Sequence, residues 1–327
     1  MVDYLLLLEK KMFKINLNYQ FLLVKFPIIF PLIYAFILYK FPSLETGLII
    51  LTILILAETH FGATWPFLLD KSNFSYIEKN KIALIIVPIV IVLLSLVGFF
   101  LINKLFLLLF FAANMFHVTR QSFGVCKLYC NEINENKFQE ISIYTLAFIF
   151  FLIGFFRFYL PIIEEKYILS LNIVLGLMFI GLCFYYLYKY SYSENFLVFV
   201  TGCLIFYPMC FVNNPVHAII MGVTMHYTQY IYLTYNIFDL RKKDQSVNNK
   251  KTFSTRFFNY FSIICLYAFA MAGFSLFGKV ENIYYQQLII IPIIGQMLHF
   301  YLDSQLWKFS DKHNRDNTLF YLKKIIK

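Results

Sequence analysis

The chain has 327 residues, of which 60% are hydrophobic and 14% are charged, and its net charge at pH 7 is +10. Soluble domains carry about 25% charged residues, so this composition excludes an ordinary soluble globular protein and indicates a polytopic membrane protein. The positive charge does not indicate a nucleic-acid partner. The lysines and arginines lie in short segments between apolar stretches, as the positive-inside bias predicts.

The N-terminal segment 1–17 has an apolar run of only about five residues before its charges begin, which is too short for a signal-peptide core. We expect this segment to lie on the membrane surface. The six cysteines fall within or at the ends of apolar stretches and form neither a disulfide framework nor a C-x-x-C pair. We interpret them as packing residues.

Ten stretches reach the roughly 20 mostly apolar residues that a spanning helix needs. They predict an all-α, polytopic transmembrane helix bundle, with residues 1–327 forming a single transmembrane domain. In chain order the stretches are 18–40, 44–69, 82–103, 105–129, 141–163, 168–190, 195–213, 215–238, 256–278 and 282–307.

The distribution of basic residues predicts the orientation of the bundle. With the N-terminus in the cytoplasm, 21 lysines and arginines fall in cytoplasmic segments and four in outer connections. Such a split indicates that both termini are cytoplasmic. Residues 308–327 are then a basic cytoplasmic tail. We expect an integral protein of a bacterial inner membrane with membrane lipid as a partner, and the sequence leaves protein partners open.

Four of the predicted spans carry polar motifs that include a histidine. Ionisable side chains are expensive in hydrocarbon and mark functional sites there, and histidine is the commonest metal ligand. In chain order the motifs are AETHFGATWPFLLD with His60, NMFHVTRQSFGVCKLY with His117, NNPVHAIIMGVTMHYTQY with His226 and GQMLHFYLDSQLWKFSD with His299.

These four spans all run from outside to inside in the predicted topology, so depth can be counted from each helix start. The four histidines then occupy a slab roughly 9 Å thick at 1.5 Å rise per residue. We expect their ring nitrogens to converge within about 5 Å, as ligands about 2 Å from one ion require. His217 lies near the start of its span, and we expect it to cap that helix.

Polar neighbours on the same helix faces are candidates for supporting roles. Gln121, Gln229 and Asp303 are each expected to orient a histidine ring, which metal-bound imidazoles need. Asp303 is alternatively a ligand itself. Arg120 is either a structural residue, snorkelling or ion-paired with Glu58 or Asp303, or it holds an anionic headgroup of the substrate. A site of three or four histidines with one carboxylate suits non-haem iron, while zinc, copper and manganese remain open.

The order of the histidines resembles that in the Brp/Blh-type β-carotene dioxygenase family. The resemblance covers His60 in HFG, His117 in a later span and His226 towards the C-terminal half. It departs from the family where HFGAT places Thr64 instead of an Asp, and where a close histidine pair is replaced by a single histidine. The resemblance implies a membrane-embedded iron protein that cleaves a carotenoid-like molecule.

Three functions follow from these residues. The leading hypothesis is a membrane-embedded, His-ligated non-haem iron oxygenase that acts on a lipid-soluble, carotenoid- or lipid-like small molecule. The metal ligands would be His60, His117, His226 and His299, supported by Arg120, Gln121, Gln229 and Asp303. The alternatives are a proton-coupled transporter that uses the intramembrane His, Arg and Glu residues, and a haem-binding membrane protein.

Overall fold

The computed structural model describes residues 21–130, 132–245, 253–278 and 286–326. All regular elements in these ranges are helices, without a strand, which confirms the all-α class. The predicted surface segment 1–17 and the middle of the basic loop 239–255 lie outside the described residues.

The α-helices are α2 (Phe26–Lys40), α3 (Glu45–Thr52), α4 (Glu58–Gly62), α5 (Thr64–Leu68), α6 (Phe74–Lys79), α7 (Val87–Leu101), α8 (Asn103–Tyr129), α9 (Ile133–Gly154), α10 (Glu165–Tyr190), α11 (Glu194–Leu204), α12 (Pro215–Gln245), α13 (Phe253–Phe277), α15 (Ile290–Leu306), α16 (Lys312–Asn314) and α17 (Phe320–Ile326). Turns with π geometry are η1 (Phe21–Lys25), η3 (Ile53–Ala57), η5 (Ile82–Ile86), η6 (Phe155–Tyr159) and η9 (Arg315–Leu319). Short 3₁₀ turns are η2 (Pro42–Leu44), η4 (Lys71–Asn73), η7 (Tyr207–Cys210) and η8 (Gln287–Ile289).

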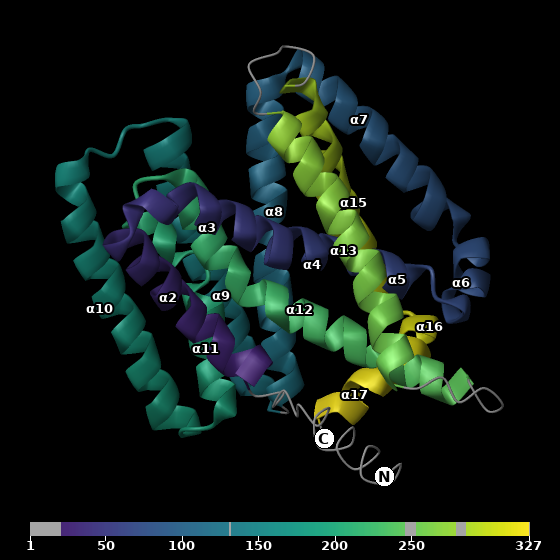
Figure 1. Cartoon of the computed structure of the whole chain (residues 1–327). Helices are drawn as coiled ribbons and strands as arrows, with labels where there is room; N and C mark the ends of the chain where they lie inside the picture. The colour runs from purple at the N-terminus through teal and green to yellow at the C-terminus, as the bar shows by residue number, and fades with distance from the viewer. Residues whose placement is uncertain (1–20, 131, 246–252, 279–285, 327) are drawn as a thin grey trace, which may run out of the picture.

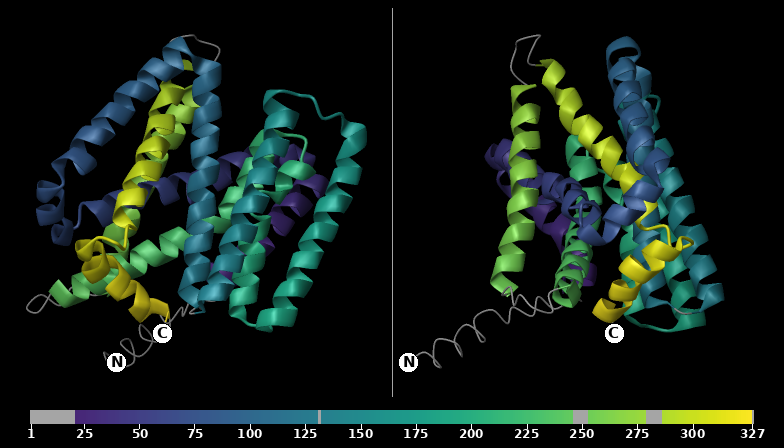
Figure 2. Two further views of the ribbon diagram at one scale, coloured as in Figure 1. Left: turned by 180° about the vertical axis from the view of Figure 1, so that it is seen from behind. Right: turned by 90° about the vertical axis from the view of Figure 1, so that its right-hand side faces the viewer.

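The helices form two groups joined by elements that cross between them. In Figure 1, α9 and α10 lie on one side and α7, α13 and α15 on the other, with α8 between them. The run from α3 to α5 and the long helix α12 cross from one group to the other, as Figure 2 also shows. At the crossing, α12 packs against α4 and α8, and α15 packs against both of these as well. The centre of the protein is therefore built from four distant parts of the chain.

Six helical segments of the described residues are long and apolar enough to cross a membrane, so the protein is a helical membrane protein by length and composition. Ten spans and the cytoplasmic placement of the termini remain predictions. Three predicted spans outside this set, in α8, α12 and α15, carry site histidines, and their polar residues lower their hydropathy. The six segments are Phe21–Lys40, Pro42–Leu68, Ile82–Leu101, Ile133–Tyr159, Lys166–Tyr190 and Thr255–Phe277.

Most residues of the apolar segments face outwards, whereas α8, α12 and the part of Pro42–Leu68 around α4 reach the interior. Only 6% of the most apolar stretch of Lys166–Tyr190 is buried within the protein. Leu169 and Phe184 on this helix are 70% and 69% exposed. Exposed apolar surface on this scale suits lipid contact and not water. The apolar segments thus surround α8 and α12, whose polar side chains meet in the interior.

Two local features shape the crossing elements. The π turn η3 comes directly before α4, and a single turn residue, Ala63, separates α4 from α5. Such turns change the rotation of the residues that follow, and they occur often at functional sites. On α12, a Cβ atom at Gly222 would collide with the carbonyl oxygen of Ile205. Glycine permits this close approach, one helical turn before His226.

Residues 308–327 were predicted as a basic tail, but the part described here is folded against the end of the bundle. Asn314, Thr318 and Leu322 are spaced four residues apart and each is 1% exposed, so one face of this segment is buried. The guanidinium of Arg241 on α12 donates to the Asn317 carbonyl at 2.8 Å and to the Thr318 hydroxyl at 2.9 Å. We call residues 308–326 the C-terminal cap.

The connection after α5 is tied to the same end of the bundle by Asp70. Its carboxylate lies 2.6 Å from the ammonium of Lys242 and accepts hydrogen bonds from the backbone and the hydroxyl of Ser72. Burial raises the pKa of Asp70, but hydrogen bonds from Lys242 and Ser72, with the charge of Lys242, outweigh it and hold the pKa at about 2. The folded protein therefore favours the ionised carboxylate.

Asp70→Asn is expected to lower the free energy of unfolding by about 2 kcal/mol at pH 7, since hydrogen bonds to charged groups contribute on this scale. The folded pKa lies below the ordinary value of 3.8. The contribution is thus complete above about pH 4 and is lost as the pH falls towards 2. In detergent, the melting temperature of Asp70→Asn should be lower than that of the unaltered protein at pH 7, and this difference should disappear below pH 3. A constant difference across this range would contradict the assignment.

Candidate metal centre

Four histidines from four elements meet where α4, α8, α12 and α15 cross. They are 0% to 7% exposed, and each comes from a different helix. The four residues are His60 on α4, His117 on α8, His226 on α12 and His299 on α15. The structure thus brings together the histidines that the depth argument selected.

Three of the four histidines satisfy the distance expected of ligands to one ion. One ring nitrogen each of His60, His117 and His299 lies within 4.8 Å of the other two. The closest pair, Nε2 of His117 and Nε2 of His299, is 3.1 Å apart. The ring of His226 packs against this group, with its centroid 4.4 Å from that of His60 and 5.8 Å from that of His117. His226 therefore borders the triad as a fourth candidate.

Several ring nitrogens in this cluster have no partner among the described residues. Both nitrogens of His60 and Nε2 of His226 are buried without a hydrogen bond. A neutral imidazole has one N–H donor and one lone pair, and a buried polar group without a partner costs about 1–3 kcal/mol. A metal ion would satisfy one lone pair on each ring, so the donor set fits a cation, while the second nitrogen of His60 keeps an N–H without a partner among the described residues.

Each cluster histidine is followed four residues later by a polar residue. Because four residues advance an α-helix by about 6 Å and return to the same face, these residues form a second layer one turn along each helix. The pairs are His60 with Thr64, His117 with Gln121, His226 with Tyr230, and His299 with Asp303.

The second layer is joined at the carboxylate of Asp303, which is 2% exposed. The Tyr230 hydroxyl donates to Oδ1 at 2.5 Å, and Gln121 Nε2 donates to Oδ2 at 2.5 Å. Thr64 also lies near Oδ1, at 3.4 Å, and its hydroxyl is 3.1 Å from that of Tyr230. All four partners of the histidines therefore belong to one buried hydrogen-bond network.

This network orients His299. Its Nδ1 lies 2.6 Å from Thr64 Oγ1 and 3.9 Å from Asp303 Oδ1. With the proton on Nδ1, the ring donates to Thr64, which in turn can donate to Asp303, and Nε2 presents its lone pair to the cluster. Carboxylates commonly fix the tautomer of metal-bound histidines in this way. Here the hydroxyl of Thr64 stands between the two groups.

Comparison of the chain with protein-family models, with curated proteins and with solved structures gave no match. The assignment of chemistry to this site therefore rests on its geometry. The resemblance to the Brp/Blh-type family stays a prediction. Thr64, which departs from the pattern of that family, has a definite place in the second layer.

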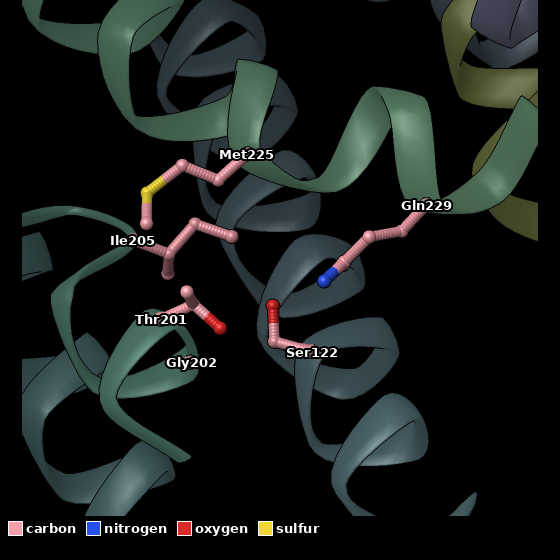
Figure 3. A pocket seen from close by; sticks show the side chains of 6 residues that line it. All are labelled: Ser122, Thr201, Gly202, Ile205, Met225 and Gln229. Carbon is pink, nitrogen blue, oxygen red and sulfur yellow. The ribbon is translucent and has the colours of Figure 1, made fainter. Parts of the chain in front are cut away.

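The predicted supporting residues take different positions. Gln121 and Asp303 lie in the second layer. Asp303 is not part of the group of three residues that can hold one ion, so its alternative role as a ligand is not supported. Gln229 instead donates to the carbonyl of Leu23 at 2.6 Å. Figure 3 shows Gln229 reaching from α12 towards Ser122 of α8. The crevice between them has a cavity volume of about 0 Å³, so it has no room for a water molecule. Gln229 therefore links α12 to η1 and forms no hydrogen bond with a cluster histidine.

Two further expectations can be compared with the structure. His217 is separate from the cluster, as expected, but its ring does not cap its own helix. Its nitrogens lie 2.8 Å from the Tyr34 hydroxyl and 2.7 Å from a Glu45 carboxylate oxygen, so it links α2, α3 and α12. Arg120 is exposed and forms no ion pair within the described residues, so the suggested pairing with Glu58 or Asp303 is not observed.

Sequence reasoning did not assign roles to Thr64 and Tyr230. Thr64 departs from the Brp/Blh-type pattern, and Tyr230 is not among the residues predicted for the site. Their common signal is the spacing of four residues from His60 and His226. That spacing marks the same helix face, and its recurrence after all four histidines would have selected both residues.

A cavity of about 730 Å³ lies beside the cluster. Its volume is within the range of about 300–1,000 Å³ that small-molecule sites occupy. It contacts His117 and His226 as well as three of the four second-layer residues, Gln121, Tyr230 and Asp303. Phe309, Leu319 and Leu322 of the C-terminal cap close part of its wall. The cluster therefore has direct access to a space for a ligand.

Proposed function

We propose that this protein is a membrane-embedded oxygenase in which His60, His117 and His299, with His226 beside them, hold one non-haem iron ion. The observation that carries the proposal is the convergence of three buried histidine nitrogens within 4.8 Å of one another, beside a cavity of about 730 Å³. Bound there, iron would supply activation of dioxygen at the coordination positions that the protein leaves open.

The chain's own residues have definite tasks in this proposal. The hydrogen-bond chain through Thr64 to Asp303 holds His299 with Nε2 free to bind. The carboxylate lies one turn from the histidines and balances positive charge in a dry interior, where unpaired charge is costly. Tyr230 places a hydroxyl on that carboxylate, and its ring centroid is 4.5 Å from that of His60. The same hydroxyl is positioned to hold a proton beside the cavity.

The substrate in this proposal is a hydrophobic small molecule that reaches the site from the lipid. Six apolar segments place the cluster inside a membrane protein, and most of the cavity wall is aromatic or aliphatic. We place the protein in a bacterial inner membrane with ten spans and both termini in the cytoplasm, as the distribution of basic residues predicts. Iron stands ahead of zinc because zinc has no redox chemistry, and a site of histidines with open coordination positions suits non-haem iron.

Metal analysis of the purified protein tests the proposal. After anaerobic incubation with Fe²⁺ and removal of excess, we expect about one iron per chain, with no strong Soret absorption band, which would indicate haem. Oxygen uptake should then appear on addition of a lipid extract from the source membrane. Full activity of a protein that contains no metal would contradict the proposal, as would stoichiometric haem.

A further inference from the structure

The cavity beside the histidines follows one face of α8. Its wall includes residues from Ala113 to Leu128 on that helix, which corresponds to a length of about 22 Å at 1.5 Å rise per residue. Spread over that length, its volume of about 730 Å³ leaves a mean cross-section of about 33 Å². Non-bonded carbon atoms approach to about 3.5–4.0 Å, so the space accommodates one extended hydrocarbon chain.

The two ends of the cavity differ in charge. Ile91 and Ala113 border one end, whereas the basic residues Arg120 and Lys127 lie at the middle and near the other end. Seven residues separate the two cations, so they lie on the same face about 10 Å apart. Both are exposed, and neither forms an ion pair within the described residues. They are therefore available to a ligand anion.

Two acidic residues also border the cavity, and neither forms an ion pair with Arg120 or Lys127 in the described part of the chain. Asp303 is engaged by the second layer of the metal centre. Glu140 on α9 is exposed and forms no ion pair with either cation in the part of the chain described. Neither carboxylate is bound directly to Arg120 or Lys127, so the N–H groups of these two cations are open to a ligand anion.

Gly124 lies between the cations and leaves room for a headgroup. No atom of another residue lies within 4 Å of where its Cβ would be. From Gly124 to His117 is seven residues, or about 10 Å. Extended chains advance about 1.2 Å per bond, so a head at Gly124 places a carbon eight to nine bonds away beside His117. The remaining chain extends towards Ala113.

We propose that the cavity binds a single-chain amphiphile with an anionic head, its carboxylate or phosphate held by Arg120 and Lys127 and the middle of its chain beside His117. The assignment of this molecule as substrate rests on the proposed function, whereas its binding does not require a metal. Arg120 thus takes the second of the two roles that the sequence suggested, and Lys127 joins it.

Binding to metal-free protein tests the proposal. The chain has two tryptophans, and Trp307 borders the cavity, so Trp65→Phe leaves Trp307 as the reporter. A dibrominated C18 carboxylate should quench its fluorescence at pH 8 in detergent. Hexadecanoate and hexadecyl phosphate should then compete at least about 10-fold more strongly than hexadecanol, as charge-assisted hydrogen bonds imply. Comparison of hexadecyl phosphate with hexadecanoate distinguishes a phospholipid-derived occupant, which carries a phosphate, from a free fatty acid, which carries a carboxylate.

Variants locate the effect. Arg120→Gln with Lys127→Gln should reduce the preference for the anion to less than about 2-fold, while Lys137→Gln, an exposed cation outside the cavity wall, should leave it unchanged. Gly124→Leu should displace the quencher, whereas Gly176→Leu on α10, which also has open space around its Cβ, should not. Both leucine variants should fold, because neither side chain meets another atom at its Cβ.

The outcomes separate this inference from the metal proposal. Equal competition by hexadecanol, a preference that survives loss of both cations, or no quenching of Trp307 would overturn it, even in a protein that binds iron. A charge-dependent preference in a protein that binds no metal would uphold it and would remove the oxygenase proposal.

Discussion

Replacement of His117 or His299 by alanine is expected to abolish stoichiometric metal binding. Each ring supplies one of the three nitrogens that lie within 4.8 Å of one another. Loss of a residue that merely orients a ligand costs 10–100-fold in metal affinity, so loss of a ligand should cost more than about 100-fold. The measurement is equilibrium binding of Fe²⁺, with Zn²⁺ as a redox-inert probe, to protein in detergent.

His217→Ala is the matched control for these two variants. His217 is also a buried histidine on a membrane helix, at 1% exposure, but it contacts Tyr34 and Glu45 instead of the cluster. We expect it to lose stability while retaining one metal per chain. If His217→Ala loses metal as completely as His299→Ala, the loss reports general disruption of the bundle, and the cluster assignment is wrong.

Asp303→Asn is expected to weaken metal binding by 10–100-fold while the metal still binds, as is usual for a residue that orients a ligand. Asn retains the size of the side chain but removes the negative charge that accepts hydrogen bonds from Tyr230, Gln121 and Thr64. Because a ligand stabilises the folded state by RT ln(1 + [L]/Kd), the metal-induced stabilisation should fall by about 1.4–2.7 kcal/mol at saturating metal. The rise in melting temperature on adding Zn²⁺ measures this change.

Asp70→Asn provides the control for Asp303→Asn. Asp70 is equally buried, at 3% exposure, but it pairs with Lys242 at the end of the bundle. Asp70→Asn should have a lower melting temperature than the unaltered protein, but its melting temperature should rise by the full amount on addition of Zn²⁺. An unchanged rise in Asp303→Asn would show that the second layer does not act on the histidines.

The histidine cluster could be predicted because the count of residues from the start of a predicted span depends on that span alone. Counting residues from the start of each span placed His60, His117, His226 and His299 at a similar level. His217 was separated from them by the same count. The rise per residue is nearly constant in an α-helix, so errors in helix ends shift the level only by a few ångströms.

The supporting residues could be predicted only in part, because side-chain direction depends on the rotation of each helix. On α12, Gln229 and Tyr230 lie three and four residues after His226, and both spacings fit the same face. Packing turns Tyr230 towards Asp303 and Gln229 towards the carbonyl of Leu23. A rotation of 100° between neighbouring residues is enough to exchange these partners.

The sequence alone determined that this is an all-α membrane protein and that a polar residue follows four of its histidines by four residues, and it predicted that these four histidines meet. These features depend on composition and helical periodicity, which are local to each segment. Only the tertiary structure decided that the rings face one another and that Asp303 joins the second layer. It also decided that a cavity with basic residues in its wall lies along α8. Those features depend on how α4, α8, α12 and α15 cross, and a crossing is set by packing between residues far apart in the chain.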